Sequence, residues 1–526
     1  MTPDFSVSNQ RGQLLPFRES LLAMLGISFV AMLVALDQTI VGTAMPRIVA
    51  DLKGFDLYAW VATSYMLASV VTIPIFGRLG DVFGRKPFLL AAIVIFTTAS
   101  VLCGMATSML SLVIARGVQG IGGGILIGTM FASVAELFPD LRVRLRWQMF
   151  VSSAFVVANF AGPTLGGMLT QYGGWRLVFF VNVPVGLISL AFVQAFLPRL
   201  KRQHPGVPVA IDWIGAVVMV VIFGLLQLLI ALVPAIGVTP VTMGLGIATV
   251  GAGVVLWSSG RKAAYPIVPF DMLVDRKLVA LFAMSVLGGF ALFTMVFYVP
   301  LLFQGGFGMS PHESGILVTP LLLGTTLGGI LNNRIITRVR RANAIVFIGF
   351  ALFMCAALGF VEINGKMPRY VWMSYMGLSG FGMGLVVSSI TLVSQHLVSR
   401  SHLGSATALL HSLRLLGGML GTAITGALLS RLYARGAHGS LSVYQASRWF
   451  RSFASPEFQV DRGEQAALIN RLIMAGHADD TMMHAARGAL VKSIHLGLAF
   501  AATAAMIGLL LAWFVPPVRI GRVGNV

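Results

Sequence analysis

The chain has 526 residues, of which 57% are hydrophobic and 10% are charged, and its mean hydropathy is +0.87. Soluble proteins carry about 45–50% apolar and about 25% charged residues, so this composition excludes a set of soluble domains and predicts a polytopic membrane protein. The net charge of +19 could indicate a nucleic-acid partner, but the basic residues lie in short segments between apolar runs. We therefore predict no nucleic-acid partner.

Apolar windows of membrane-spanning length recur along the chain. A helix crosses a hydrocarbon core of about 30 Å with about 20 residues. The 48 uncharged residues between Asp212 and Arg261 are long enough for two helices, with Pro234 and Pro240 near the turn. In chain order the predicted spans lie in the windows 20–46, 57–77, 88–115, 110–135, 147–175, 177–198, 212–258 counted twice, 278–312, 314–333, 342–361, 370–399, 403–430 and 493–518. The sequence predicts an all-α protein with 14 membrane helices.

The basic residues predict the orientation. Positive charge in short connections is retained on the cytoplasmic side of a membrane. With the N-terminus inside, cytoplasmic connections carry 22 lysines and arginines and the short external loops carry five. Because the number of spans is even, we expect both termini in the cytoplasm. The membrane we expect is the cytoplasmic (inner) membrane of a bacterium. Residues 431–489 contain no spanning window, so we expect an external loop with short surface helices.

Polar side chains inside the spans are candidate functional residues, because a lone charge in a membrane is costly. Asp37 in the first span and Arg116 in the fourth lie at the same depth, so a pairing is geometrically possible. Gln119 is one turn from Arg116, and Asn159 and Asn182 add polar groups at middle to outer depth. These side chains either line one water-accessible cavity or form a polar network that fixes helix packing.

Other features bear on binding and chemistry. Arg414 has no deep acid available, so we expect it to face water, a helix-end carbonyl or an anionic ligand. Cys103 and Cys355 lie in uncharged stretches, and we expect both to be buried apolar residues. The spans contain no His-Glu-x-x-His motif and no paired carboxylates, so we expect neither a metal site nor an enzyme.

Four segments carry a family resemblance. They read LDQTIVGTAMP from Leu36, GRLGDVFGRKP from Gly77, RGVQG from Arg116 and GPTLGG from Gly162. The chain therefore resembles the major facilitator superfamily, specifically its 14-helix drug:proton antiporter branch, over nearly its whole length.

The resemblance implies two six-helix bundles with two inserted helices. The expected domains are a cytoplasmic N-terminus at 1–19, an N-terminal bundle at 20–198, a cytoplasmic linker at 199–211, the two inserted helices at 212–258, a C-terminal bundle at 278–515 that contains the external loop 431–489, and a cytoplasmic C-terminus at 516–526.

The polar side chains in the spans and the resemblance together predict roles for individual residues. The expected proton-coupling residues are Asp37 and Arg116, and the expected substrate-cavity residues are Gln38, Gln119, Asn159, Asn182 and Arg414. The expected gating residues are Gly77, Gly80, Asp81, Gly84, Arg85 and Glu136, and the antiporter motif comprises Gly162, Pro163, Gly166 and Gly167.

The implied function is a proton-driven efflux transporter, or drug:proton antiporter, that exports lipophilic small molecules by alternating access. Its expected partners are the small-molecule substrate, protons and membrane lipid, and no cofactor is implied. Because the last six spans hold no membrane carboxylate, we expect neutral, weakly cationic or anionic cargo. The alternatives are a dedicated metabolite exporter or importer of the same fold, or a transporter-like sensor. A periplasmic adaptor is a further candidate partner.

Overall fold

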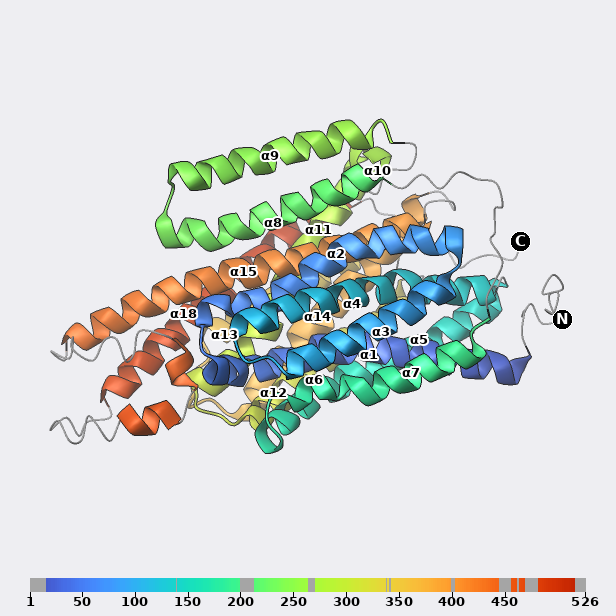
Figure 1. The fold of residues 1–526 in the computed structure, drawn as a ribbon. Helices are drawn as coiled ribbons and strands as arrows, with labels where there is room; N and C mark the ends of the chain where they lie inside the picture. Colours follow the sequence, from blue (N-terminus) through green and yellow to red (C-terminus); the bar gives the residue numbers. More distant parts are fainter. Residues whose placement is uncertain are drawn as a thin grey trace.

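The protein folds into a bundle of long, nearly parallel helices in its computed structural model (Figure 1). The structure describes residues 16–138, 140–198, 212–263, 270–336, 338–339, 342–398, 403–443, 456–460, 463–468 and 481–515. Within these ranges, 14 helices are long and apolar enough to cross a membrane, and all of the regular secondary structure is helical. The predicted all-α membrane fold and its number of spans are confirmed.

The helices of the N-terminal half are α1 (Phe17–Leu52), α2 (Tyr58–Phe83), α3 (Arg85–Gly104), α4 (Met109–Leu137), α5 (Leu141–Tyr172), α6 (Leu177–Phe180) and α7 (Asn182–Phe196). Two helices follow, α8 (Trp213–Ile236) and α9 (Pro240–Gly260), and then the short α10 (Phe270–Val274). The C-terminal half contains α11 (Arg276–Leu301), α12 (Pro311–Ile335), α13 (Ala342–Val361), α14 (Arg369–Leu397), α15 (Leu403–Val443) and α18 (Thr481–Leu511).

The two halves pack in the same pattern, which defines two six-helix bundles. In the N-terminal half α1 packs on α5 and α7, and α4 packs on α2 and α3. The equivalent contacts in the C-terminal half join α11 to α15 and α18, and α14 to α12 and α13. The bundles meet through α5 against α12, α2 against α15 and α1 against α11, so their interface repeats the same symmetry.

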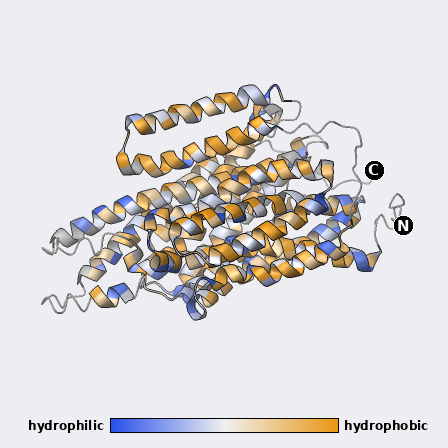
Figure 2. Ribbon diagram, viewed as in Figure 1, coloured by the Kyte–Doolittle hydropathy of each residue, from blue (hydrophilic) through white to orange (hydrophobic). Residues whose placement is uncertain are grey.

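The helices α8 and α9 form a hairpin outside the bundles, drawn in green at the top of Figure 1. Helix α8 contacts α2 and α15, whereas α9 packs chiefly on α8. Only 6% of the most apolar window of α9 is buried, against 67% for α1. Its residues are nevertheless largely hydrophobic (Figure 2), as expected of a helix whose sides face lipid.

Local sequence signals explain where several helices begin. Ser310 and Glu313 form a reciprocal capping box at the start of α12, with Pro311 at the first helical position. A second capping box, formed by Thr239 and Thr242, starts α9. These caps satisfy backbone N–H groups that have no partner within the helix.

The two helices that flank the predicted external loop 431–489 extend into that segment. Helix α15 continues to Val443, and α18 already begins at Thr481. The apolar window underestimates helix length because backbone hydrogen bonding continues after a helix reaches water, where charged side chains such as Arg431 and Arg435 are well solvated.

One cysteine also differs from expectation, and three predicted domains are not described. Cys103 is buried as predicted, but Cys355 lies on an exposed face of α13. The prediction for Cys355 is wrong because the sequence of an apolar span does not reveal which side of the helix faces the lipid. The linker 199–211, the C-terminus 516–526 and most of the N-terminus 1–19 lie outside the described residues.

Candidate functional site

An ion pair lies in the interior of the N-terminal bundle. Asp37 comes from the middle of α1 and Arg116 from α4, and Arg116 Nη1 donates a hydrogen bond to Asp37 Oδ2 at 2.7 Å. Both side chains are buried, with 2% of the Arg116 side chain and 0% of the Asp37 side chain exposed. The structure thus brings together the two charges that the sequence places at one depth.

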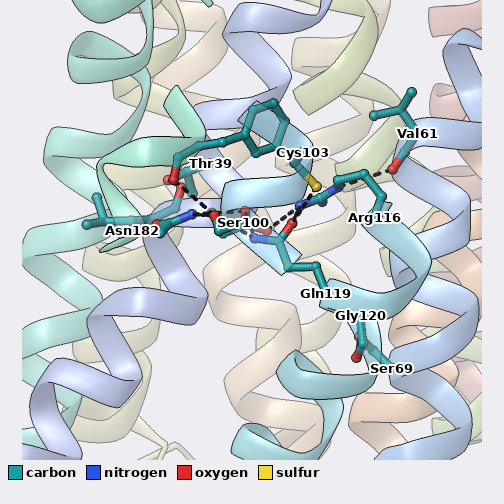
Figure 3. Close-up of polar contacts among 12 residues, drawn as sticks. Thr39, Val61, Ser69, Ser100, Cys103, Arg116, Gln119, Gly120 and Asn182 are labelled. Carbon is teal, nitrogen blue, oxygen red and sulfur yellow. Dashed lines mark hydrogen bonds and ion pairs between the residues drawn. The ribbon is translucent and has the colours of Figure 1, made fainter. Parts of the chain in front are cut away.

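Amide and hydroxyl side chains complete the coordination of this pair. Gln119 accepts from Arg116 Nη1 at 2.7 Å and donates to Asp37 Oδ1 at 2.9 Å. Asn182, the first residue of α7, donates to Asp37 Oδ1 at 3.3 Å and to Ser100 Oγ at 2.9 Å. Figure 3 shows Asn182, Ser100, Gln119 and Arg116 in one row. We call Asp37, Ser100, Arg116, Gln119 and Asn182 the polar cluster; it joins α1, α3, α4 and α7.

Helix α2 forms the other side of the arginine. Arg116 Nε donates to the carbonyl oxygen of Val61 at 3.3 Å, and the guanidinium lies 4.4 Å from the centre of the Tyr65 ring. The helices approach this closely because position 120 is glycine: a Cβ at Gly120 would lie 2.8 Å from the Cα of Tyr65. The aromatic face and the carbonyl add to the stabilisation of a buried cation.

The polar cluster is a packed hydrogen-bonded network in this conformation. Both oxygens of Asp37 accept hydrogen bonds, which stabilises the charged carboxylate. Asp37 is also the only carboxylate deep within a membrane helix among the described residues. The pairing of Asp37 with Arg116 therefore joins α1 and α4 within the interior of the N-terminal bundle.

Three predicted cavity residues do not take part in these hydrogen bonds. Gln38 follows Asp37 on α1 and is half-buried, and Asn159 is half-buried on α5. Arg414 lies in the other bundle, where it contacts His411 on the same helix. Adjacent spans and similar depth do not bring side chains together when they project from different faces of their helices.

The segment Gly162–Gly167 of α5, which reads GPTLGG, lies between two other helices. A Cβ at Gly166 would lie 2.8 Å from the carbonyl oxygen of Ile40 in α1. On the other side, a Cβ at Gly167 would lie 3.0 Å from the Cα of His312 and closer still to the carbonyl oxygen of Pro311 in α12. The missing side chains therefore allow α5 to contact its own bundle and the partner bundle at once.

Replacing Gly167 with alanine is expected to weaken the contact between the bundles, because the added methyl group overlaps the backbone of Pro311. Overpacking of this kind costs about 1–3 kcal/mol, so the ratio of separated to closed bundles should rise about 5- to 150-fold. Spin labels at the exposed residues Met105 and Lys366, one in each bundle, would report the change as longer distances, with Cys355 replaced by serine.

Gly117→Ala is the matched control for this change. It lies on α4, and a Cβ there meets nothing within 4 Å. Its distance distribution should equal that of the wild type. An unchanged distribution in Gly167→Ala as well would show that this glycine does not hold the bundles together.

The predicted gating loop lies at the end of the molecule where α2 meets α3. Gly84 links the two helices with φ of 86°, a conformation that favours glycine. Arg85 pairs with Glu136 of α4 at 3.2 Å and also donates to the carbonyl oxygen of Ala132. Gly77 and Gly80 lie in α2 against α4, and Asp81 is also in α2 but its side chain lies outside the described residues.

The opposite end of the molecule, where α1 ends and α2 begins, is called the distal end. Bundle-to-bundle hydrogen bonds lie in this half: Tyr58 Oη to Phe297 O, Gln304 Nε2 to Thr43 O, and Thr164 Oγ1 to Thr319 Oγ1, each at 2.8 Å. Gly42 packs here too, since its Cβ would lie 2.8 Å from the carbonyl oxygen of Val296. The bundles are therefore closed against each other at the distal end.

The sequence offered little signal for some members of this site. Ser100, which contacts both Gln119 and Asn182, is one small hydroxyl among several in its span. Tyr65 and the carbonyl of Val61 are equally ordinary. Their roles depend on how α2 and α3 are rotated against α4, which the packing of the bundle determines.

A symmetric pair of membrane-embedded bundles with a buried polar cluster defines a class of protein, the multi-pass membrane transporters. Comparison with known sequences agrees: the profile of the Major Facilitator Superfamily matches residues 27–422, and the chain belongs to this family. It is a transporter and not an enzyme.

Individual relatives are similar over most of their length. The Multidrug transporter protein MdtP of Bacillus subtilis (strain 168) is 32% identical over 417 residues, covering 78% of this chain and 75% of the relative. Multidrug resistance protein 3 of the same organism is 30% identical over 470 residues, covering 86% and 89%. A solved bacterial homologue of the human lysosomal transporter Spinster, inward-facing and unoccupied, shares the fold with a TM-score of 0.60 and 16% identity, covering 95% of this chain and 99% of that one.

Proposed function

We propose that this protein is a proton-driven exporter of lipophilic small molecules that works by alternating access. The observation that carries the proposal is the buried Asp37–Arg116 pair at 2.7 Å, joined to Gln119 and Asn182. A titratable carboxylate at this depth is expensive unless it serves function or packing. The names of the two Bacillus relatives, a multidrug transporter and a multidrug resistance protein, support a role in moving drug molecules.

The coupling would follow from competition for Asp37. In the present conformation the carboxylate is paired with Arg116 and bound by two amides. When a proton binds to the carboxylate, the group becomes neutral and its attraction to Arg116 is lost, so α1 and α4 are free to separate. A potential of about 100 mV supplies about 2.3 kcal/mol per charge, enough for a roughly 40-fold concentration ratio of a neutral cargo per proton.

The proposed orientation assigns the described conformation to one step of the cycle. The distribution of basic residues favours cytoplasmic termini in a bacterial inner membrane, so the distal end would face outward. The distal hydrogen bonds would then close the outward path, and the Arg85–Glu136 pair would lie at the cytoplasmic end as part of the gate.

The test is proton movement triggered by cargo. The purified protein would be reconstituted in liposomes that contain a pH-sensitive dye, a pH gradient imposed, and neutral, cationic and anionic lipophilic compounds added in turn. We expect a compound-dependent dye response that a protonophore abolishes and that protein-free liposomes lack. Compound movement without proton movement would contradict coupling. No movement of any compound would favour a dedicated metabolite carrier or a sensor. Adding cell extract to the same liposomes would then distinguish these two, because only a carrier would move one of its components.

A further inference from the structure

A second polar site lies in the C-terminal bundle, in a cavity of about 130 Å³ between α11, α14 and α15. Its polar lining comprises Ser285, Thr391, Thr407, His411 and Arg414, and the rest is Met, Val, Ile, Leu and one glycine. The hydroxyl groups of Ser285 and Thr391 donate to helix carbonyls at 2.8 Å. The Arg414 guanidinium and the His411 imidazole are the nitrogen donors in this lining.

The contact between these two residues assigns the histidine proton. Arg414 Nη2 lies 2.5 Å from His411 Nδ1, and a guanidinium can only donate, so Nδ1 accepts. A neutral imidazole then carries its proton on Nε2. This atom is buried and has no hydrogen-bond partner among the described residues. The site therefore combines the guanidinium of Arg414 with the Nε2–H of His411, which has no acceptor among the described residues.

The charge of Arg414 is not balanced by the cavity wall. The residues that line the cavity include no aspartate or glutamate. Arg414 is 11 residues into α15, which at 1.5 Å per residue places it about 16 Å from the start of the helix, within the candidate membrane span Ala406–Gly436. An unpaired arginine inside a membrane helix costs about 2.5–3.5 kcal/mol. Arg116 avoids this cost because it pairs with the buried carboxylate of Asp37.

Close packing holds Arg414 in place beside the cavity. A Cβ at Gly289 of α11 would lie 3.1 Å from the Cα of Arg414 and 2.8 Å from its carbonyl carbon, so glycine is needed there. A Cβ at Gly417, one turn along α15, would lie 2.6 Å from the carbonyl carbon of Val286. The two glycines fix α15 against α11 with Arg414 between them, so this arginine is held inside the bundle.

We propose that this cavity binds the acidic group of lipophilic carboxylate or sulfonate cargo, with Arg414 as the counter-ion and His411 Nε2–H as a second donor. The inference rests on the proposed export of lipophilic molecules and names a cargo class for it. The cavity has a volume of about 130 Å³. It accommodates the acidic group and a few adjoining carbons, while the apolar lining contacts the hydrocarbon.

The test compares three probes with one ring system: 2-naphthylacetate, the neutral 2-naphthylacetamide and the cationic 2-naphthylethylamine. Binding to the purified full chain in lipid nanodiscs would be measured by calorimetry. We expect the wild type to prefer the carboxylate. In Arg414→Gln the carboxylate affinity should fall about tenfold or more, because a charge-assisted hydrogen bond is lost, while the amide affinity changes less than twofold. Arg414→Lys should restore part of the loss.

Arg431→Gln is the matched control, since it makes the same change on an exposed part of α15. It should leave all three affinities unchanged. His411→Phe removes the Nε2 donor but keeps a ring, and a three- to tenfold loss confined to the carboxylate is expected; it decides the question if Arg414→Gln does not fold. Equal affinity of the wild type for carboxylate and amide, or a parallel loss of both probes in the variants, would overturn the proposal.

Binding and transport outcomes separate this inference from the proposed function. Carboxylate binding that depends on Arg414, in a protein that moves no compound in liposomes, would support the anion site and reject export. Proton-coupled export with no dependence of carboxylate binding on Arg414 would support export and reject the anion site.

Discussion

The substitution Asp37→Asn is expected to abolish proton-coupled transport, reducing the cargo-triggered proton flux by about 100-fold or more. The amide has nearly the shape of the carboxylate but cannot bind and release a proton in this pH range. Gln119 and Asn182 can still hydrogen-bond to its oxygen, whereas Arg116 loses its counter-ion, so we expect a folded bundle that is less stable than the wild type. Dye-loaded liposomes would measure the flux, and calorimetry would show that cargo still binds within about threefold.

Asp51→Asn is the control for this prediction. Asp51 lies on the same helix, but its side chain is 47% exposed and pairs with Arg176 at 3.0 Å. Its removal should leave proton flux near the wild-type value. If Asp37→Asn transports normally, Asp37 is not the coupling residue and the polar cluster has a packing role.

Replacing Arg116 with methionine should produce the largest loss of stability, about 3–5 kcal/mol in the free energy of unfolding. The change leaves Asp37 as an unpaired carboxylate inside the membrane bundle. The double variant Asp37→Asn/Arg116→Met should recover most of this loss, because no buried charge remains. Unfolding in mixed detergent micelles would measure the three variants as a double-mutant cycle.

The exposed ion pair between Asp51 and Arg176 supplies the comparison for that cycle. Arg176→Met removes the partner of Asp51, and these side chains are 44% and 47% exposed. Screening by water limits such a pair to less than about 1 kcal/mol. A double variant as unstable as Arg116→Met alone would show that the arginine acts through packing and not through its charge.

The sequence alone was sufficient to predict the membrane class, the number of spans and the depth of the central charges. Hydropathy is a local property, and about 20 apolar residues must form a helix in lipid because no water satisfies their backbone groups. The same depth argument placed Asp37 near Arg116, and their contact follows from the adjacency of α1 and α4.

Only the tertiary structure could decide which side chains meet. Asn182 joins the polar cluster and Asn159 does not, although both are amides in neighbouring spans. Arg414 contacts His411 beside a cavity and no carboxylate lines that cavity. These outcomes depend on the rotation of each helix about its own axis, which close contacts such as Gly120 on Tyr65 determine. An apolar span surrounded by lipid and neighbouring helices does not encode that rotation in its own hydropathy, because both environments are apolar.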